Sequence, residues 1–537
     1  MKPEFPQDKF PYADIRKCMK TICVLFAGQA TKHAFSPLSG GPSAFDRALE
    51  RSQAFPDVAR VLVLSSAPVR SSSSVAFDQR TQERWSVSSF FSALAEESVG
   101  FDHAFVFWAD APFIDPKLTD ALYRKHLRYA AEYTFADGYP YGLAPEILAG
   151  GLLPILVGLT KDCADSVPRS AIFDAVKRDI NSFDIETEIA PTDLRQLRLE
   201  LVCDTKRNAM LCESLEGITA DNYAERAKSR GFALRTLPSF YAVQVAAKCP
   251  FECLYCPYPG FCQSGKGRSP GKKATSLDAY MPRSSFSALL DKISDFSEDA
   301  VVSLSLWGEC SYHPEIAGLI ADVLARPSLS VLIETTGIGW SRASLDSIAA
   351  AVRAAAPRAN GQNPINWIVS LDAAGSALYG QAHGLADGAT AHLRDAMSFT
   401  QDAAALFPGM VWPQIVRMNE NEAELEPFYR FWKEKLGRVI VQKHDHFCRS
   451  VPDRRVADLS PLVRNPCWHL KRDMCILLDG TVPFCREDLY GSRSCGNALT
   501  DDLESIWAGN RSLYEQHVCG IHEGMCGACD EYYTYNF

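Results

Sequence analysis

The chain has 537 residues, which is enough for about three domains with sizeable cores. Hydrophobic residues make up 47% and charged residues 22%, as in ordinary globular proteins. The net charge of −10 argues against general affinity for nucleic acids, which needs a basic face. No apolar run approaches the roughly 20 residues that span a bilayer, and residues 1–16 lack the apolar core of a signal peptide. We therefore expect a cytoplasmic protein without a membrane span.

Cysteine usage differs between the two halves of the chain. Of the 18 cysteines, five precede Cys249 and thirteen lie from Cys249 onward. A cytosolic protein keeps its thiols reduced, so this many cysteines indicate metal binding rather than disulfides. We expect the metal chemistry in the second half of the chain.

The first 232 residues are predicted to form an α/β domain. Buried strands are expected, with helices between them, at 21–27, 61–65 and 103–108. Several segments resemble the cytidylyltransferase-like sugar-nucleotide transferases, especially those of spore-coat polysaccharide type: 26–29 with 37–42, 109–116, 139–146 and, more loosely, 197–205. The resemblance implies that Asp110 and Asp204 bind Mg²⁺, a hard cation that prefers oxygen ligands.

The loop after the first strand departs from that family. Residues 29–36 lack the glycines expected there, and Ser36 stands where the family has a phosphate-binding lysine. Only Lys32 could serve electrostatically. Without close backbone approach and fixed cations, phosphoryl charge is poorly stabilised. We therefore expect a degenerate transferase fold that binds a ligand or supports the structure rather than catalysing transfer.

The most informative segment is 248–257, which contains Cys249, Cys253 and Cys256 in the spacing CxxxCxxC. Iron–sulfur clusters are normally held by four cysteine thiolates. Three thiols can bind three irons of a four-iron cluster and leave the fourth iron open to a substrate or cofactor. The alternative is a structural zinc site with Cys262 as its fourth ligand, although the spacing across a Pro/Gly loop fits no familiar zinc pattern.

Strand and helix patterns alternate through the middle of the chain. Six strands are predicted at 240–247, 301–307, 330–336, 365–372, 410–417 and 438–444. The helices between them are predicted near 286–293, 314–324, 343–356, 389–407 and 423–435. Alternation of this kind argues for parallel βα units.

A strand that leads at once into CxxxCxxC, with the aromatic Tyr255 before the third cysteine, resembles the radical SAM superfamily. Six βα units likewise resemble the partial (β/α)6 barrel of these enzymes, whose sites lie at the carboxyl ends of the strands. The resemblance implies that the open iron binds the amino and carboxylate groups of S-adenosylmethionine (SAM). An electron from the cluster then cleaves SAM to a 5′-deoxyadenosyl radical.

Polar residues follow the predicted strands where such a cofactor site needs them. The resemblance assigns Gly308 and Glu309 to the SAM ammonium group, and Ser370 and Asp372 to the ribose hydroxyls. A guanidinium at Arg417 suits the SAM carboxylate by bidentate pairing. Two further cofactor contacts are expected at Tyr255 and Thr335.

A second group of cysteines lies in the tail. Cys467 and Cys485, followed by the terminal pair Cys526 and Cys529, resemble a SPASM domain, which carries auxiliary clusters in many radical SAM enzymes. A turn signal at 479–480 would fold Cys485 back toward Cys467. The resemblance implies that these four cysteines hold one auxiliary 4Fe–4S cluster. A zinc ribbon is the alternative, and the spare thiols that could replace a ligand are Cys475, Cys495 and Cys519.

The order of the three parts, 1–232, 233–448 and 449–537, resembles the spiro-SPASM proteins over essentially the whole chain. It implies a radical SAM enzyme that abstracts hydrogen from its substrate and takes electrons from a donor such as flavodoxin or ferredoxin. A peptide or protein substrate is favoured because SPASM enzymes often modify peptides. The N-terminal domain suggests the alternative of a cell-envelope sugar or nucleotide-linked small molecule, and a non-catalytic metal-binding scaffold is a third hypothesis.

Overall fold

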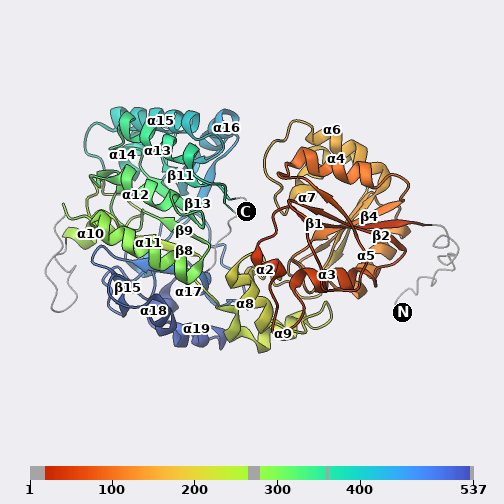
Figure 1. Cartoon of the computed structure of the whole chain (residues 1–537). Helices are drawn as coiled ribbons and strands as arrows, with labels where there is room; N and C mark the ends of the chain where they lie inside the picture. The colour runs from red at the N-terminus through yellow and green to blue at the C-terminus, as the bar shows by residue number, and fades with distance from the viewer. Residues whose placement is uncertain (1–18, 264–277, 359–361, 533–537) are drawn as a thin grey trace, which may run out of the picture. The chain divides into compact units, whose positions relative to one another are not determined.

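The computed structural model describes residues 19–263, 278–358 and 362–532, except for the side chains of 261–263. The chain forms two compact units, Met1–Arg230 and Gly231–Phe537, whose helices and strands are labelled in Figure 1. The cysteine-rich tail belongs to the second unit, and the domain boundaries expected from the sequence stay predictions. Within the described ranges, no helix is both long and apolar enough to cross a bilayer.

The first unit is built on a seven-stranded mixed sheet with the order β3-β2-β1-β4-β6-β5-β7. Its strands are β1 (Thr21–Ala27), β2 (Val58–Ser65), β3 (Asp78–Thr81), β4 (His103–Trp108), β5 (Tyr133–Asp137), β6 (Glu146–Ala149) and β7 (Ile185–Ile189). β6 runs antiparallel to β4 and β5, whereas the other pairs are parallel. Every residue of β1 is buried, as its central place between β2 and β4 requires. The three strands expected here are confirmed.

Helices cover both faces of this sheet, with α4 and α6 on one face and α3 and α5 on the other (Figure 1). The helices are α2 (Lys32–Phe35), α3 (Ala44–Ser52), α4 (Val87–Glu97), α5 (Pro116–Arg128), α6 (Leu153–Thr160), α7 (Ala171–Val176), α8 (Lys206–Ser214) and α9 (Tyr223–Ser229). The strand order reverses between β1 and β4. In α/β sheets, ligands bind in the crevice at the carboxyl ends of strands at such a point.

The second unit contains a seven-stranded sheet in the order β13-β12-β11-β10-β9-β8-β14, and every neighbouring pair is parallel. Six strands are those expected from the sequence: β8 (Phe240–Val243), β9 (Ala300–Ser303), β10 (Leu329–Thr335), β11 (Ile365–Ser370), β12 (Val411–Arg417) and β13 (Ile440–Lys443). They lie side by side in chain order, as successive βα units do. The prediction of an α/β fold with parallel strands is confirmed.

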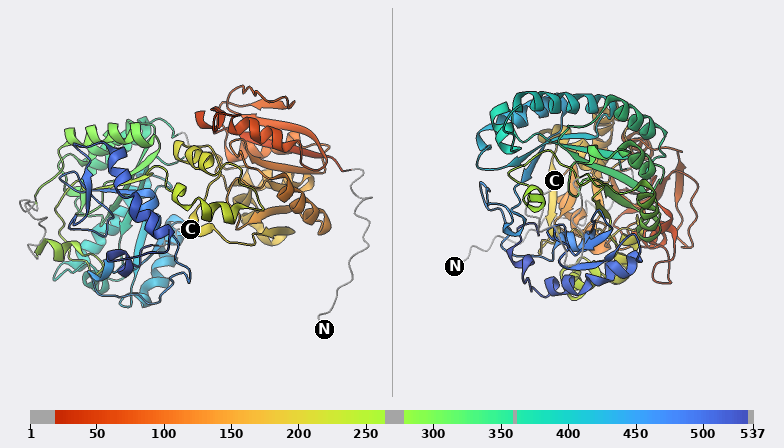
Figure 2. Two further views of the ribbon diagram at one scale, coloured as in Figure 1. Left: turned by 90° about the horizontal axis from the view of Figure 1, so that it is seen from below. Right: turned by 90° about the vertical axis from the view of Figure 1, so that its left-hand side faces the viewer.

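Helices alternate with these strands and form an outer layer. They are α11 (Arg283–Ser297), α12 (Ile316–Leu324), α13 (Arg342–Ala354), α14 (Ser376–Ala382), α15 (Ala389–Leu406) and α16 (Leu425–Leu436). The right-hand view of Figure 2 shows them, in green to cyan, curving around the outside of the strands. The main core lies between this layer and the sheet, with Trp367 of β11 completely buried in it.

The seventh strand comes from the tail and was not expected from the sequence. β14 (Asp473–Ile476) pairs in parallel with β8. The expected turn at 479–480 does form, since Leu477 N donates to Thr481 O (2.8 Å) and Gly480 has φ +84°. The strand after it, β15 (Thr481–Pro483), pairs with β16 (Ser494–Asn497) in a separate two-stranded sheet. The tail is therefore joined to the barrel by a shared sheet.

Candidate active site

The cysteine loop follows β8 and is supported on one side by the loop after β9. Glu309 N donates to Lys248 O (2.7 Å), so the backbone just before Cys249 is hydrogen-bonded to this second loop. Gly308 has φ +78°, and a Cβ at this position would lie 2.2 Å from Ala246 O. Only glycine permits both this backbone conformation and this approach. The segment expected to bind the cofactor therefore also supports the cysteines.

The Glu309 carboxylate is buried, and the residue is only 3% exposed. Its oxygens accept hydrogen bonds from Thr335 Oγ1 (2.8 Å), Thr336 N (2.9 Å) and Thr336 Oγ1 (2.9 Å). Burial raises the pKa of Glu309, and these hydrogen bonds oppose the rise. Three of the expected cofactor residues, Gly308, Glu309 and Thr335, thus lie together beside the cysteine loop.

The other side of the cysteine loop rests on the end of α14. Leu254 N donates to Ala382 O (2.9 Å), and Glu252 N donates to His383 O (3.2 Å). Cys253 Sγ lies 3.4 Å from His383 Nδ1. His383 is completely buried, and burial lowers its pKa to about 4, so the ring is neutral at pH 7. No sequence pattern predicts this contact, because the two residues are 130 positions apart.

Tyr255 and Asp372, both expected to contact SAM, contact each other. Tyr255 Oη donates to Asp372 Oδ2 (2.8 Å), while Val416 N donates to Asp372 Oδ1 (2.6 Å). His383 Nε2 lies 3.5 Å from Asp372 Oδ2. Asp372 is completely buried at φ +59°, and burial raises its pKa to about 7. Its carboxyl group orients the cysteine loop through Tyr255 and does not reach solvent.

Ser370 and Arg417 lie at the carboxyl ends of β11 and β12. Ser370 Oγ accepts a hydrogen bond from Gln414 Nε2 (3.4 Å). Arg417 Nε and Nη2 donate to the two oxygens of Glu422 at 2.8 and 2.6 Å. This bidentate pair uses the donors that were expected to receive the SAM carboxylate. A ligand carboxylate at Arg417 would have to replace Glu422, and that contact stays a prediction.

Cys249 and Cys256 border an apolar cluster that reaches into the tail. The rings of Tyr258 and Trp307 stack in it with their centroids 6.1 Å apart and their planes at 6°. The other buried members of the cluster are Ala242, Leu306, Cys475 and Leu489. Such surroundings exclude water from one side of the two thiols. The side chain of Cys262, the fourth ligand of the zinc alternative, lies outside the described residues.

The four expected auxiliary ligands come from three places in the tail. Cys467 precedes α17 (Trp468–Arg472), Cys485 follows β15, and Cys526 and Cys529 lie in and just after α20 (Met525–Ala528). Burial raises the pKa values of Cys467, Cys485 and Cys526, and the charge of Cys529 adds to each rise. Charges influence one another in this way only at short range. Cys526 also packs against the small apolar cluster that contains Cys467, so the fold brings the tail thiols into one region.

A fifth cysteine, Cys448, joins this group and was missed in the sequence. Its short 3-10 helix, η8 (Phe447–Arg449), packs against α20. A hydrogen bond from Cys448 lowers the pKa of Cys529. The three residues of η8 have φ values of +47°, +52° and +70°, and left-handed backbone costs non-glycine residues roughly 1–2 kcal/mol each. No sequence pattern predicts such a turn, so Cys448 looked isolated.

The three spare cysteines have different surroundings. Cys475 is buried on β14, where it contributes to the raised pKa of Cys485. Cys495 Sγ donates to Asn510 Oδ1 (3.0 Å). Cys519 is exposed at the end of α19 (Arg511–Val518). Cys519 is therefore the natural control thiol for substitutions in the tail.

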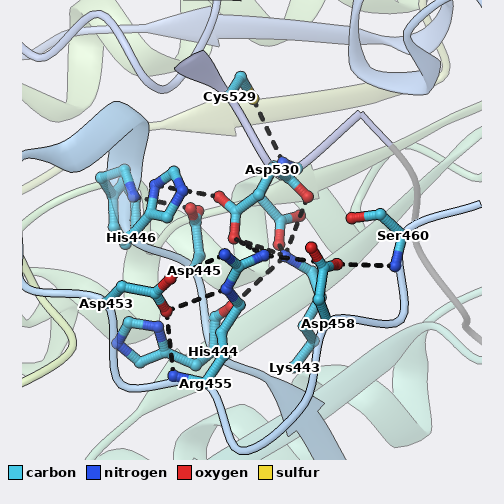
Figure 3. Close-up of polar contacts among 12 residues, drawn as sticks. Lys443, His444, Asp445, His446, Asp453, Arg455, Asp458, Ser460, Cys529 and Asp530 are labelled. Atoms are coloured by element: carbon cyan, nitrogen blue, oxygen red, sulfur yellow. Dashed lines mark hydrogen bonds and ion pairs between the residues drawn. The ribbon is translucent and has the colours of Figure 1, made fainter. Parts of the chain in front are cut away.

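An ion-pair network beside the auxiliary cysteines fastens the tail to β13 (Figure 3). Asp530 lies 3.2 Å from His446 Nδ1 and 3.4 Å from Lys443 Nζ. The ligand atoms of Asp445, His446 and Asp530 lie within 4.8 Å of one another, which is close enough for a metal ion. However, Arg486 pairs with Asp445 (2.9 Å), and Lys443 balances Asp530. We therefore assign this group to ion pairing.

In the first unit, Asp110 and Asp204 lie close together, and both contact Arg169. The nitrogen Nη2 of Arg169 lies 2.6 Å from Asp110 Oδ2 and 3.2 Å from Asp204 Oδ2. At the end of α2, Ser36 Oγ donates to the backbone carbonyl of Lys32 (2.8 Å), so the residue in place of the expected lysine caps a helix turn. A guanidinium occupies the position expected for Mg²⁺, and these residues do not fit a bound metal.

Three solved structures align with parts of this chain at low identity. BtrN in complex with AdoMet and 2-DOIA is 15% identical, with 55% of this chain and 94% of that chain covered and a TM-score of 0.34. SuiB of Streptococcus suis is 14% identical, with 58% of this chain and 75% of that chain covered and a TM-score of 0.41. A cytidylyltransferase of Leptospira borgpetersenii is 15% identical, with 40% of this chain and 97% of that chain covered and a TM-score of 0.33. All three TM-scores lie below 0.5, so none of these likenesses supports an inference about activity.

Sequence comparison gives a firmer relationship. No protein-family model matches the chain. One protein of Treponema pallidum (strain Nichols), described as uncharacterized, is 46% identical over 83 residues, or 14% of this chain and 38% of that protein. Another uncharacterized protein of the same organism is 47% identical over 373 residues, which cover 68% of this chain and 99% of that protein. The chain therefore belongs to the same family as this second Treponema pallidum protein.

Proposed function

We propose that the second unit is a radical SAM enzyme whose 4Fe–4S cluster is held by Cys249, Cys253 and Cys256. The observation that carries this proposal is the cysteine loop, which follows a strand of a parallel sheet and is fixed from both sides. In βα folds, active sites lie at the carboxyl ends of the strands. The donor set fits a four-iron cluster with one open iron, because a closed site needs a fourth thiolate.

When bound, the cluster supplies the electron that cleaves SAM to methionine and a 5′-deoxyadenosyl radical, which abstracts hydrogen from the substrate. The residues of the chain hold and shield this site. The neutral ring of His383 lies against Cys253, and the buried pair Tyr255–Asp372 fixes the orientation of the loop. The aromatic stack beside the other two cysteines keeps water from the reactive centre.

The interior face of the sheet supports a polar or charged substrate. On β10, Ile333 and Thr335 are buried, whereas Glu334 between them is exposed. Successive residues of a strand point to opposite faces, so Glu334 faces away from the core and into the interior. Although water reaches Glu334 in the interior, the protein surrounds this side chain; this enclosure raises the pKa of Glu334, and the charge of Arg486 opposes the rise, so the two groups are near each other. We favour a peptide substrate, whose amide and charged groups suit this pair, over a sugar or nucleotide-linked molecule.

We also propose one auxiliary 4Fe–4S cluster in the tail, held by Cys467, Cys485, Cys526 and Cys529. The packing of Cys526 against the apolar cluster that contains Cys467, together with the influence of the Cys529 charge on the other three thiols, supports this assignment. Glu531 N lies 3.2 Å from Cys529 Sγ, and backbone hydrogen bonds to thiolates help set the potential of such clusters. A cluster in the same compact unit as the barrel is suited to anchor the substrate or to carry electrons.

The test is anaerobic reconstitution of the full chain with iron and sulfide, followed by measurement of 5′-deoxyadenosine in the presence of SAM and a reductant. The wild-type protein and the control variant Cys519→Ala, which changes an exposed thiol, should both form the product. Cys249→Ala, Cys253→Ala and Cys256→Ala should form none, because each removes a ligand of the cluster. Product from Cys249→Ala would refute the assignment. Zinc in place of iron would instead establish a structural metal site.

A further inference from the structure

In the first unit, one guanidinium joins two carboxylates near the point where the strand order reverses. Arg169 Nη1 and Nη2 donate to Asp110 Oδ1 and Oδ2 at 3.2 and 2.6 Å. Nη2 also donates to Asp204 Oδ2 at 3.2 Å. Asp110 is only 3% exposed, so this pairing lies inside the protein. Bidentate arginine–carboxylate pairs are among the strongest hydrogen-bonded contacts in proteins.

The surroundings hold Arg169 and its partners in place. The guanidinium lies over the rings of Tyr141 and Trp108, 5.4 and 6.0 Å from their centroids. Asn208 Nδ2 donates to Asp204 Oδ1 (2.8 Å), which fixes the second carboxylate. Arg169 and Asp204 therefore have partners besides the ion pair itself. The arrangement is a built site rather than a chance contact of mobile side chains.

This arrangement is incompatible with a divalent cation at the same carboxylates. Mg²⁺ requires oxygen ligands at about 2.0–2.1 Å in a nearly octahedral arrangement. Asp110 Oδ2 and Asp204 Oδ2 both accept hydrogen bonds from the same nitrogen, Nη2 of Arg169, instead. A metal ion and the guanidinium would compete for one space and repel each other. Two carboxylates with one guanidinium also keep a net negative charge, which disfavours a triphosphate that arrives without a metal.

We infer that Arg169 is a built-in replacement for the divalent cation, so that the first unit binds its ligand without Mg²⁺. The inference concerns a different unit from the proposed radical chemistry and does not depend on it. Tyr141, which is 38% exposed as a residue, places its ring beside the charged groups, which donate and accept hydrogen bonds. These features suit a ligand that carries hydroxyl groups rather than a metal-bound triphosphate.

The test uses Mn²⁺ alone as the probe, because it prefers the same oxygen ligands and its binding is counted by EPR. The wild-type full chain should show no saturable Mn²⁺ site that depends on Asp110. The variant Arg169→Ala should gain one such site, because both carboxylates become available. The double variant Arg169→Ala/Asp110→Asn should lose it again. The control Arg195→Ala, which removes an exposed arginine paired with Asp193 (2.6 Å), should gain none.

Two results would overturn the inference. The first is saturable Mn²⁺ binding by the wild-type protein that Asp110→Asn abolishes, because Arg169 would then yield its place to the metal. This comparison uses only the wild-type protein and Asp110→Asn, so it does not depend on the folding of any Arg169 variant. The second is a folded Arg169→Ala protein, with the circular dichroism and melting temperature of the wild type, that gains no Mn²⁺ site. If Arg169→Ala does not fold, Arg169→Gln removes the charge but keeps a hydrogen-bond donor, and the same gain is expected of it.

Discussion

Two of the three regions expected to bind metal, the cysteine loop and the pair Asp110 and Asp204, differ in what faces their ligands. Beside the cysteine loop, burial lowers the pKa of His383 to about 4 and raises that of Asp372 to about 7, so both groups tend toward their neutral forms. Between Asp110 and Asp204, by contrast, Arg169 already supplies a positive charge. A cluster iron would bind the three thiols of the loop as thiolates, whereas Arg169 already offsets part of the charge of the two carboxylates and occupies the space between them.

This contrast shows that a set of ligand residues is not by itself a metal site. The donors are visible in the sequence, because they lie in one short segment or at the ends of strands. The group that faces these donors in the folded protein cannot be recognised in the sequence. Arg169 is 59 residues from Asp110 and 35 residues from Asp204, in a segment that belongs to none of the recognised motifs. Its contact with both exists only in the folded unit.

The largest expected effect is on iron content, because both groups of cysteines should bind iron whereas the carboxylate pair should bind no metal. The reconstituted wild-type protein should hold two clusters, or about eight irons. Cys529→Ser should lose about half of this iron, because Cys529 is one of the four proposed ligands of the auxiliary cluster. Cys448→Ser should keep it, because Cys448 adds a fifth thiol to a set that is already complete. Loss of iron from Cys448→Ser, with Cys519→Ser unchanged as the control, would make Cys448 a ligand and contradict the assigned set.

A smaller effect is expected on stability and concerns the protonation of Asp372. Its pKa is raised from about 3.9 in an unfolded chain to about 7, mainly because burial disfavours the charged form. The folded state therefore binds this proton more tightly, so the stabilisation is fully present at low pH and is lost as the pH rises from about 4 through 7. The amide in Asp372→Asn cannot ionise, so this variant lacks the part of the pH dependence that Asp372 contributes.

Chemical denaturation at about pH 5 and about pH 8 measures this difference. We expect the wild-type protein to lose roughly 2–3 kcal/mol more than Asp372→Asn across this range, with the sign set by the raised pKa. Other buried groups titrate in both proteins and cancel in the comparison. Equal pH dependence of the two proteins would show that Asp372 is ionised in the fold and that its hydrogen bonds outweigh its burial.

The regular parts of the second unit could be predicted, and contacts across long separations could not. The six barrel strands follow from local apolar patterns, and Gly308, Glu309 and Thr335 converge because parallel strands end at one edge. β14 is a strand only because it pairs with β8, far earlier in the chain. Cys448 reaches Cys529 through a left-handed turn that no residue pattern encodes. His383 reaches Cys253 only through the fold.

The decisive experiment for the open iron is the EPR spectrum of the reduced cluster before and after addition of SAM. The Cys529→Ser protein is the sample of choice, since it should hold only the cluster bound by Cys249, Cys253 and Cys256. SAM should shift the signal of this protein, because one iron has no ligand from the chain and SAM binds to it. A spectrum that SAM leaves unchanged, in a protein with a full complement of iron at this cluster, would contradict a radical SAM site.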